Sequence, residues 1–316
     1  MPDVIALGEL LIDFTCKSTD ADGYPTMEAH PGGAPANFLA ALTRFGHRTA
    51  MVGKVGADAF GQMLTETLKK AGIDTRGLVM DERVFTTLAF VTLDETGNRT
   101  FSFARKPGAD TQLRSDEVEW SLIDEAKVFH FGTLSLTDEP ARTATQKAVA
   151  YARSQGKLIT YDPNLRKPLW RDLHEARTQL LWGLGQADVV KISDEEVEFL
   201  FGADPQTGAE LLLRDFGVKL VFVTCGPHGC WFQNARAMGH VESLNGIKVV
   251  DTTGAGDIFG GAAVHGILQS GKTPEQLEEA ELRGIVRFAC TAAGLSTTRP
   301  GGISSVPSLE TVRNYG

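Results

Sequence analysis

A glycine-rich turn between two apolar segments carries the clearest chemical signal in this sequence. Residues 251–257 lead from an apolar run, expected to be a strand, into the apolar stretch 258–263, expected to be a helix. Gly254 and Gly256 leave the backbone bare, so amide N–H groups can converge on an anion where the helix begins. Asp257, on the first turn, could take a proton from an attacking hydroxyl, or it could simply cap the helix.

The composition is typical of a soluble globular enzyme. The 316 residues, 42% hydrophobic and 22% charged, suit one large α/β domain. A net charge of −9 argues against nucleic acid as the main partner, because binding a phosphate backbone needs a basic surface. The four cysteines form no Cys-x-x-Cys pair, which argues against a zinc site. Neither a signal peptide nor a membrane-spanning run is recognised, so a cytoplasmic location is expected.

Strands and helices alternate in the second half of the chain. Alternation of this kind predicts a parallel sheet covered by helices on both faces. Residues 4–14 are expected to form one strand near the start, and short β-type runs ending with 247–250 predict an antiparallel edge. Between these, the expected strands are 128–131, 158–162, 189–192 and 220–224.

A β-hairpin interrupts the helical rhythm. It is expected at 85–93 and 99–104, with its turn at 94–98. Because open α/β sheets bind ligands at the carboxyl ends of their strands, we interpret the hairpin as part of a small β lid over those ends. An ordinary edge hairpin is the alternative. The expected organisation is one domain, 1–316, with a lid from 15–30 and 84–107.

The common nucleotide and hydrolase motifs are absent. No P-loop and no Gly-x-Ser-x-Gly occurs, and Phe259 stands where the Rossmann fingerprint needs glycine, which disfavours a dinucleotide-dependent oxidoreductase. Instead, Asp-Thr-Thr-Gly-Ala-Gly-Asp at 251–257 closely resembles the C-terminal signature of the PfkB/ribokinase family of sugar kinases. Gly-Gly-Ala-Pro-Ala-Asn at 32–37 resembles the N-terminal signature of the same family. The resemblance covers essentially the whole chain.

The resemblance implies an α/β fold of the ribokinase type, with a three-layer αβα core, a mostly parallel sheet and a small β-sheet lid. It also implies ATP as the phosphoryl donor and a sugar or nucleoside hydroxyl as the acceptor. Asp257 then corresponds to the catalytic base, and Gly254, Ala255 and Gly256 correspond to the anion hole. The positions that match the sugar-binding residues of the family are Asp13, Gly32, Gly33 and Asn37.

Residues 191–196 fall where the family carries Asn-x-x-Glu. Glu196 matches the glutamate that organises Mg²⁺ through water, whereas Ser193 stands where asparagine is common. Ser193 as an N-cap with acidic residues behind it explains the same stretch. Cys290 occupies a place near adenine where Asn or His is frequent. The positions implied to bind nucleotide are Lys191, Ser193, Thr224, Gly226, Gly229, Ala255 and Gly256.

Many relatives bind a monovalent cation beside the anion hole, held largely by backbone carbonyls. The resemblance therefore implies potassium as well as magnesium. The matching positions are Asp251, Thr253, Ser296, Arg299, Gly301 and Ser305.

The segments 130–136 and 161–166 look most like those of bacterial-type fructokinases, so the expected reaction makes fructose 6-phosphate. Arg105 and Arg166 match substrate-side arginines, although either could form a structural ion pair. Two arginines would also suit 2-keto-3-deoxygluconate. A kinase for that acid or for ribose, and a catalytically silent sugar-binding regulator, are the alternatives. Lid hairpins in this family often pair between subunits, which suggests a homodimer.

Overall fold

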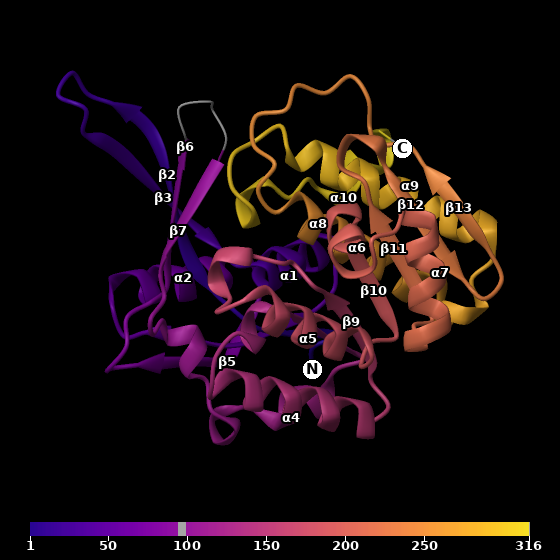
Figure 1. The fold of residues 1–316 in the computed structure, drawn as a ribbon, viewed down its shortest axis with the longest axis horizontal. Helices are drawn as coiled ribbons and strands as arrows, with labels where there is room; N and C mark the ends of the chain where they lie inside the picture. Colours follow the sequence, from indigo (N-terminus) through magenta and orange to yellow (C-terminus); the bar gives the residue numbers. More distant parts are fainter. Residues whose placement is uncertain (94–98, 316) are drawn as a thin grey trace.

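The computed structural model describes residues 1–93 and 99–315, and within them the strands build two separate sheets (Figure 1). Nine of these strands form the large sheet. They are β1 (Val4–Leu7), β4 (Thr49–Gly56), β5 (Asp74–Asp81), β8 (Val128–Gly132), β9 (Leu158–Asp162), β10 (Val189–Ser193), β11 (Leu220–Thr224), β12 (Cys230–Asn234) and β13 (Met238–Val241).

The order across the large sheet is β13-β12-β11-β10-β9-β8-β1-β4-β5. The pairs β11–β12 and β12–β13 are antiparallel, and the other pairs are parallel. This arrangement confirms the predicted parallel sheet with an antiparallel edge. It also places the carboxyl ends of β1, β8, β9, β10 and β11 along one side of the molecule, where an open α/β sheet binds its ligands.

Alternate side chains of the strands enter two separate cores, one on each face of the sheet. In β1, for example, Val4 and Ala6 belong to one core, and Ile5 and Leu7 belong to the other. The first core packs against α1 (Ala34–Arg44), α2 (Ala59–Lys70), α8 (Ala255–Ser270), α9 (Glu279–Ser296) and α10 (Leu309–Tyr315). The second packs against α3 (Trp120–Glu125), α4 (Ala141–Ser154), α5 (Leu173–Leu184), α6 (Asp194–Phe201) and α7 (Pro205–Phe216). In the described ranges, no helix combines the length and apolar content needed to cross a bilayer.

The second sheet has the order β3-β2-β6-β7 and stands away from the core at the left of Figure 1. Its strands are β2 (Leu11–Thr19), β3 (Pro25–Gly32), β6 (Leu88–Leu93) and β7 (Arg99–Ala104). The predicted hairpin strands therefore pair with each other, and β6 also pairs with β2. The predicted turn at 94–98 lies outside the described residues. We call this four-stranded sheet the lid.

Two predicted strands differ from the structure. The single strand expected at 4–14 is broken after Leu7, because the chain leaves the large sheet there and enters the lid at Leu11. The strand expected at 247–250 is a loop, and its valines at 249 and 250 are more than half exposed. Instead of pairing with a strand, the backbone N–H groups of Val250 and Asp251 both bond to the carbonyl of Thr297. Apolar residues alone therefore did not indicate a strand here.

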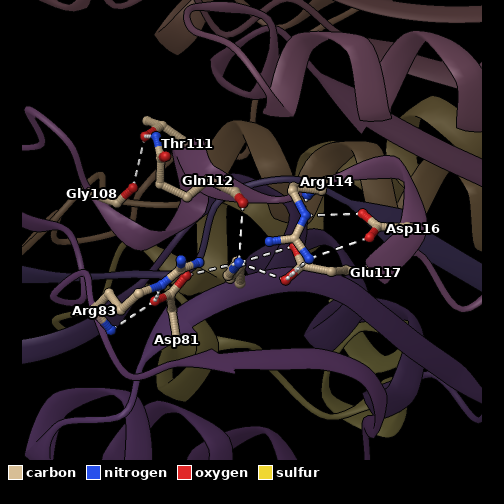
Figure 2. Close-up of polar contacts among 9 residues, drawn as sticks. Asp81, Arg83, Gly108, Thr111, Gln112, Arg114, Asp116 and Glu117 are labelled. Carbon is tan, nitrogen blue, oxygen red and sulfur yellow. Dashed lines mark hydrogen bonds and ion pairs between the residues drawn. The ribbon is translucent and has the colours of Figure 1, made fainter.

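A buried lysine joins two strands of the large sheet, β4 and β5, to residues 112–117 (Figure 2). The Nζ of Lys54, at the end of β4, lies 2.8 Å from Asp81 and 2.8 Å from Glu117, and it also donates to the carbonyl of Gln112. The side chains of Lys54 and Asp81 are 2% and 3% exposed. The hydrogen bond from Lys54 holds the pKa of Asp81 down to about 2. Because both charges are out of water, this cluster can persist only if all its members remain paired.

Candidate active site

Two glycine loops meet at the carboxyl ends of the strands. The first ends β3 and begins α1, with Gly33 as the N-cap at φ 122°. A Cβ at Gly33 would lie 2.5 Å from the carbonyl oxygen of Glu9, so only glycine fits there. Glu9, two residues after the end of β1, accepts a hydrogen bond from the N–H of Ala34 at 2.9 Å. Burial raises the pKa of Glu9 to about 7. The predicted sugar loop is thus fastened to the strand that precedes the lid.

The second glycine loop begins α8. Gly254 is the N-cap in the left-handed conformation, at φ 75°, and a Cβ there would lie 3.0 Å from Asn37 Nδ2. At Gly256 a Cβ would lie 2.9 Å from Lys191 Nζ. The backbone of the predicted anion hole therefore carries no side chain at Gly254 or at Gly256. The amide of Asn37 lies against Gly254, and the ammonium group of Lys191 lies beside Gly256. Such a helix start, with a cation next to it, is suited to a phosphate group.

Asp257 lies on the first turn of α8 and accepts hydrogen bonds from two side-chain amides. Asn37 Nδ2 donates to Oδ2 at 2.9 Å, and Asn164 Nδ2 donates to Oδ1 at 3.0 Å. Burial raises the pKa of Asp257, while the hydrogen bonds from these amides and the charges of Lys191 and Arg166 oppose that shift. The side chain is therefore aligned and basic, which is what a general base needs.

The predicted sugar residues gather beside Asp257. The carboxylate of Asp13 lies against Gly32, where any side chain would collide with it. Burial raises the pKa of Asp13 to about 6; the charge of Arg166 opposes this shift, and that of Asp257 adds to it. Arg166 is exposed and acts on both carboxylates. A group of hydrogen-bonding side chains next to this carboxylate can hold a polyol.

Arg105 takes part in a buried network at the lid's base. Its guanidinium lies 2.7 Å from Asp110 and donates to Thr137 Oγ1 and to the carbonyl of Leu134, both at 2.8 Å. The structural ion pair, one of the two interpretations of this residue, is therefore present. Arg105 also lines a cavity of about 650 Å³ between β7 and Trp170.

Lys191, on β10, forms a buried ion pair next to the anion hole. Its Nζ lies 3.1 Å from Asp162, the last residue of β9. Burial works against the charge of Lys191, yet the carboxylates of Asp162, Glu196 and Asp257 keep its pKa raised. Burial likewise raises the pKa of Asp162, against the opposing charge of Lys191. The amine therefore stays charged in a place where a phosphate would lie.

Ser193 and Glu196 form a capping box at the start of α6. Ser193 accepts from the N–H of Glu196, and Glu196 Oε2 accepts from the N–H of Ser193 at 2.9 Å. The N-cap role considered for Ser193 is thus present. In addition, Glu196 Oε1 accepts from the N–H of Leu165 at 2.6 Å. Glu196 therefore ties the loop after β9 to α6, and each of its oxygens keeps a second lone pair.

The segments predicted to hold a monovalent cation lie together. Asp251 Oδ1 accepts from both the N–H and the hydroxyl of Thr253, and Oδ2 accepts from the N–H of Gly301 at 3.0 Å. Ser296 and Ser305 each donate to a backbone carbonyl nearby. Arg299 directly precedes this loop's Pro-Gly-Gly sequence. Across the described residues, no group of three or more His, Cys, Asp and Glu side chains could hold a metal ion directly.

The loop after β11 contains Thr224, Gly226 and Gly229, which were predicted to bind nucleotide. Both glycines have positive φ, at 52° and 86°, and a side chain at Gly229 would collide with the carbonyl of Val241. Cys290 is buried. Sequence reasoning gave no role to Asn164, Asp162 or Glu9. The available signal was that all three lie at the carboxyl end of a core strand or within two residues after it.

An open α/β sheet, a helix start suited to an anion with a carboxylate on its first turn, and a separate lid are the arrangement expected of a sugar kinase of the phosphotransferase class. The sequence profile described as pfkB family carbohydrate kinase matches residues 1–309. The chain belongs to this family and is fructokinase-like.

Three known proteins illustrate the similarity. The chain is 44% identical over 310 residues to the probable fructokinase-3 of Arabidopsis thaliana, across 96% of this chain and 88% of that protein. The fructokinase of Xylella fastidiosa with bound ATP gives a TM-score of 0.91 at 30% identity, over 100% of this chain and 98% of that one. A double mutant of the fructokinase of Vibrio cholerae O395, with fructose, ADP and potassium bound, gives 0.84 at 29% identity, over 99% and 98%.

Proposed function

We propose that this protein is an ATP-dependent kinase that phosphorylates the primary hydroxyl of fructose to give fructose 6-phosphate. The observation that carries the proposal is the position of Asp257, held by two amides on the first turn of the helix whose bare start can bind phosphate. The names of the similar proteins support fructose as the acceptor.

In the proposed reaction, Asp257 accepts the proton of the sugar hydroxyl as its oxygen attacks the γ-phosphorus of ATP. A new oxygen–phosphorus bond forms, the bond from the γ-phosphorus to the bridging oxygen breaks, and ADP leaves with that electron pair. The N–H groups at Gly254 and Gly256 and the ammonium group of Lys191 would stabilise the negative charge on the transferring group. The N–H of Ala255, which donates to the carbonyl of Thr252 at 3.2 Å, would join them by exchanging that carbonyl for a phosphate oxygen.

ATP would lie along β10 and β11. The contacts proposed for it are those of Lys191, Ser193, Thr224, Gly226 and Gly229, which come from neighbouring strand ends. Mg²⁺, when bound, neutralises phosphate charge, and Glu196 would hold it through water with the lone pairs left free by its backbone contacts. Potassium would lie between 251–253 and 296–305, where Asp251 already draws the two segments together.

The sugar would bind to Asp13, Gly32, Gly33 and Asn37, with Arg166 at the open side. Arg105 would contribute to sugar binding indirectly, by holding together the residues at the base of the lid. An acidic sugar such as 2-keto-3-deoxygluconate remains the second candidate acceptor, because Arg166 has no carboxylate within ion-pair distance in the described residues. The whole chain would act as one domain, with two copies paired through the lid.

The test is ATP-dependent ADP release with fructose, ribose, glucose, adenosine and 2-keto-3-deoxygluconate. Fructose should give the highest kcat/KM. Ribose or the keto acid well above fructose would overturn the substrate assignment, and no turnover with any acceptor would favour a sugar-binding regulator. Asp257→Asn should keep sugar binding and lose transfer by at least about 100-fold. Equal rates in potassium and sodium buffers would overturn the proposal of a potassium site.

A further inference from the structure

Asn164 has a backbone conformation unlike that of any other side-chain-bearing residue in the described ranges. It is the one non-glycine residue there with positive φ, at 51°. It follows Pro163, the first residue after β9, and its side chain donates to Asp257 Oδ1 at 3.0 Å. A left-handed backbone at a residue other than glycine is costly, and the sites that retain one commonly use it.

Asn164 and Asn37 hold opposite oxygens of the same carboxylate. Asn37 comes from the first turn of α1 and Asn164 from the loop after β9, so Asp257 is fixed from two different elements. One amide on each oxygen fixes the rotation of the carboxylate and leaves one lone pair on each oxygen for an incoming proton. The amide of Asn37 has a fixed orientation as well, because turning it over would point its oxygen at the carboxylate.

We propose that Asn164 is a positioning residue that aims the carboxylate of Asp257 at the sugar hydroxyl, an inference that rests on the proposed function. Asparagine meets two demands at this place. It tolerates the left-handed conformation better than other side-chain-bearing residues, and its amide can donate to the base. Glycine would keep the turn and lose the donor, whereas aspartate would keep the shape and place a second negative charge against the base.

The loop that carries Asn164 is held on both sides. Asp162 pairs with Lys191 just before it, and the N–H of Leu165 donates to Glu196 just after it. The amide of Asn164 is therefore placed with little freedom, as a group that orients a base must be. Arg166 lies two residues further on and its charge acts on Asp13, one of the proposed sugar residues, so the same loop could link sugar binding to the alignment of the base.

The charged groups that act on Asp257 set the direction of the pH effect. Asp13 and Asp162 face it with like charge, and Lys191 and Arg166 with opposite charge. The hydrogen bond from Asn164 lowers the pKa of Asp257. Removing that donor must therefore raise the pKa of the base, so a higher pH is needed to deprotonate it. The acidic limb of the kcat profile should move to higher pH.

The experiment compares Asn164→Gly and Asn164→Asp with wild type and with Asp257→Asn, by ADP release from pH 5.5 to 9. We expect Asn164→Gly to lower kcat at least about tenfold, to change the KM for fructose and ATP by less than about threefold, and to melt near the wild-type temperature. Asn164→Asp should move the acidic limb further upward, by about one unit or more, because two carboxylates then share the site.

The outcomes separate the two proposals. If Asp257→Asn is inactive while Asn164→Gly keeps the wild-type kcat and pH limb, Asn164 is only a turn residue and this inference is wrong. If Asp257→Asn keeps its rate, the proposed role of the base is itself wrong. If Asn164→Gly is unstable, Asn164→Asp decides, because it retains the shape of the side chain; an unshifted limb in that variant overturns the inference.

Discussion

Gly256→Ala probes the anion hole more directly than any other single substitution. A Cβ added at Gly256 would lie 2.9 Å from Lys191 Nζ and 3.5 Å from its Cε. Non-bonded atoms of this kind need about 3.5 Å, so the amine must withdraw by roughly 0.6 Å. Asp162, the buried partner of Lys191, lies 3.1 Å from Nζ and limits the directions in which the amine can move. Displacing a charged donor on this scale should lower kcat by about 10- to 100-fold.

Gly260→Ala on the same helix is the matched control. A Cβ there would lie 3.5 Å from the Phe38 ring, which is an ordinary contact, and alanine favours a helix over glycine by about 1 kcal/mol. This control should keep full activity and melt at the wild-type temperature or above it. The assay is initial ADP release at saturating fructose and ATP, with melting curves for all three proteins. A kcat for Gly256→Ala within about twofold of wild type would refute the placement of Lys191 beside the transferring group.

Two further predictions concern stability. Lys54→Met removes the buried ammonium group from between Asp81 and Glu117, and leaves Asp81 with the backbone N–H and the more distant guanidinium of Arg83. It should lower the free energy of unfolding by about 3 kcal/mol in urea titrations. Lys69→Met, at an exposed ion pair, should change this free energy by less than about 1 kcal/mol, and similar losses in the two variants would contradict the cluster's role. Burial lowers the pKa of His265 to about 4, so the neutral side chain is favoured in the folded protein. The stabilisation from His265 is therefore complete above pH 6.5 and is lost as the pH falls toward 4. The melting temperature of His265→Phe should therefore fall less between pH 7 and pH 5 than that of the wild type. An equal fall in the two proteins would count against this account.

The sequence predicted the large sheet because its signal is local. Buried parallel strands such as β10 are short apolar runs between helices with clear caps, and Asp58 at the start of α2 is an example of such a cap. What the sequence could not show was where one sheet passes into another. Residues 4–14 are apolar almost throughout, and only the pairing of Leu11 and Ile12 with the lid reveals the break after Leu7. Pairing depends on distant residues, which periodicity does not report.

The site divides in the same way. The glycine loops were recognisable because their residue types are required by backbone shape at Gly33 and Gly254. Two contacts of the site join residues that are far apart in the sequence. The ion pair of Lys191 with Asp162 spans 29 positions, and the hydrogen bond from Asn164 to Asp257 spans 93, so no spacing rule could predict them. Arg105 shows the converse case. Its match to substrate-side arginines was visible in the sequence, but its partners at the lid's base were not.

The two amides that hold Asp257 come from two segments that would also hold the sugar. Asn37 lies on the first turn of α1, just after Gly32 and Gly33, and Asn164 precedes Arg166 in the loop after β9. Helix α8 carries the carboxylate and would supply the N–H groups for phosphate, but it does not set the direction of the carboxylate by itself. A loop displaced by a poorly fitting ligand would therefore also misalign the base. In the proposed reaction, selection of the sugar and activation of its hydroxyl would then be two consequences of the same contacts.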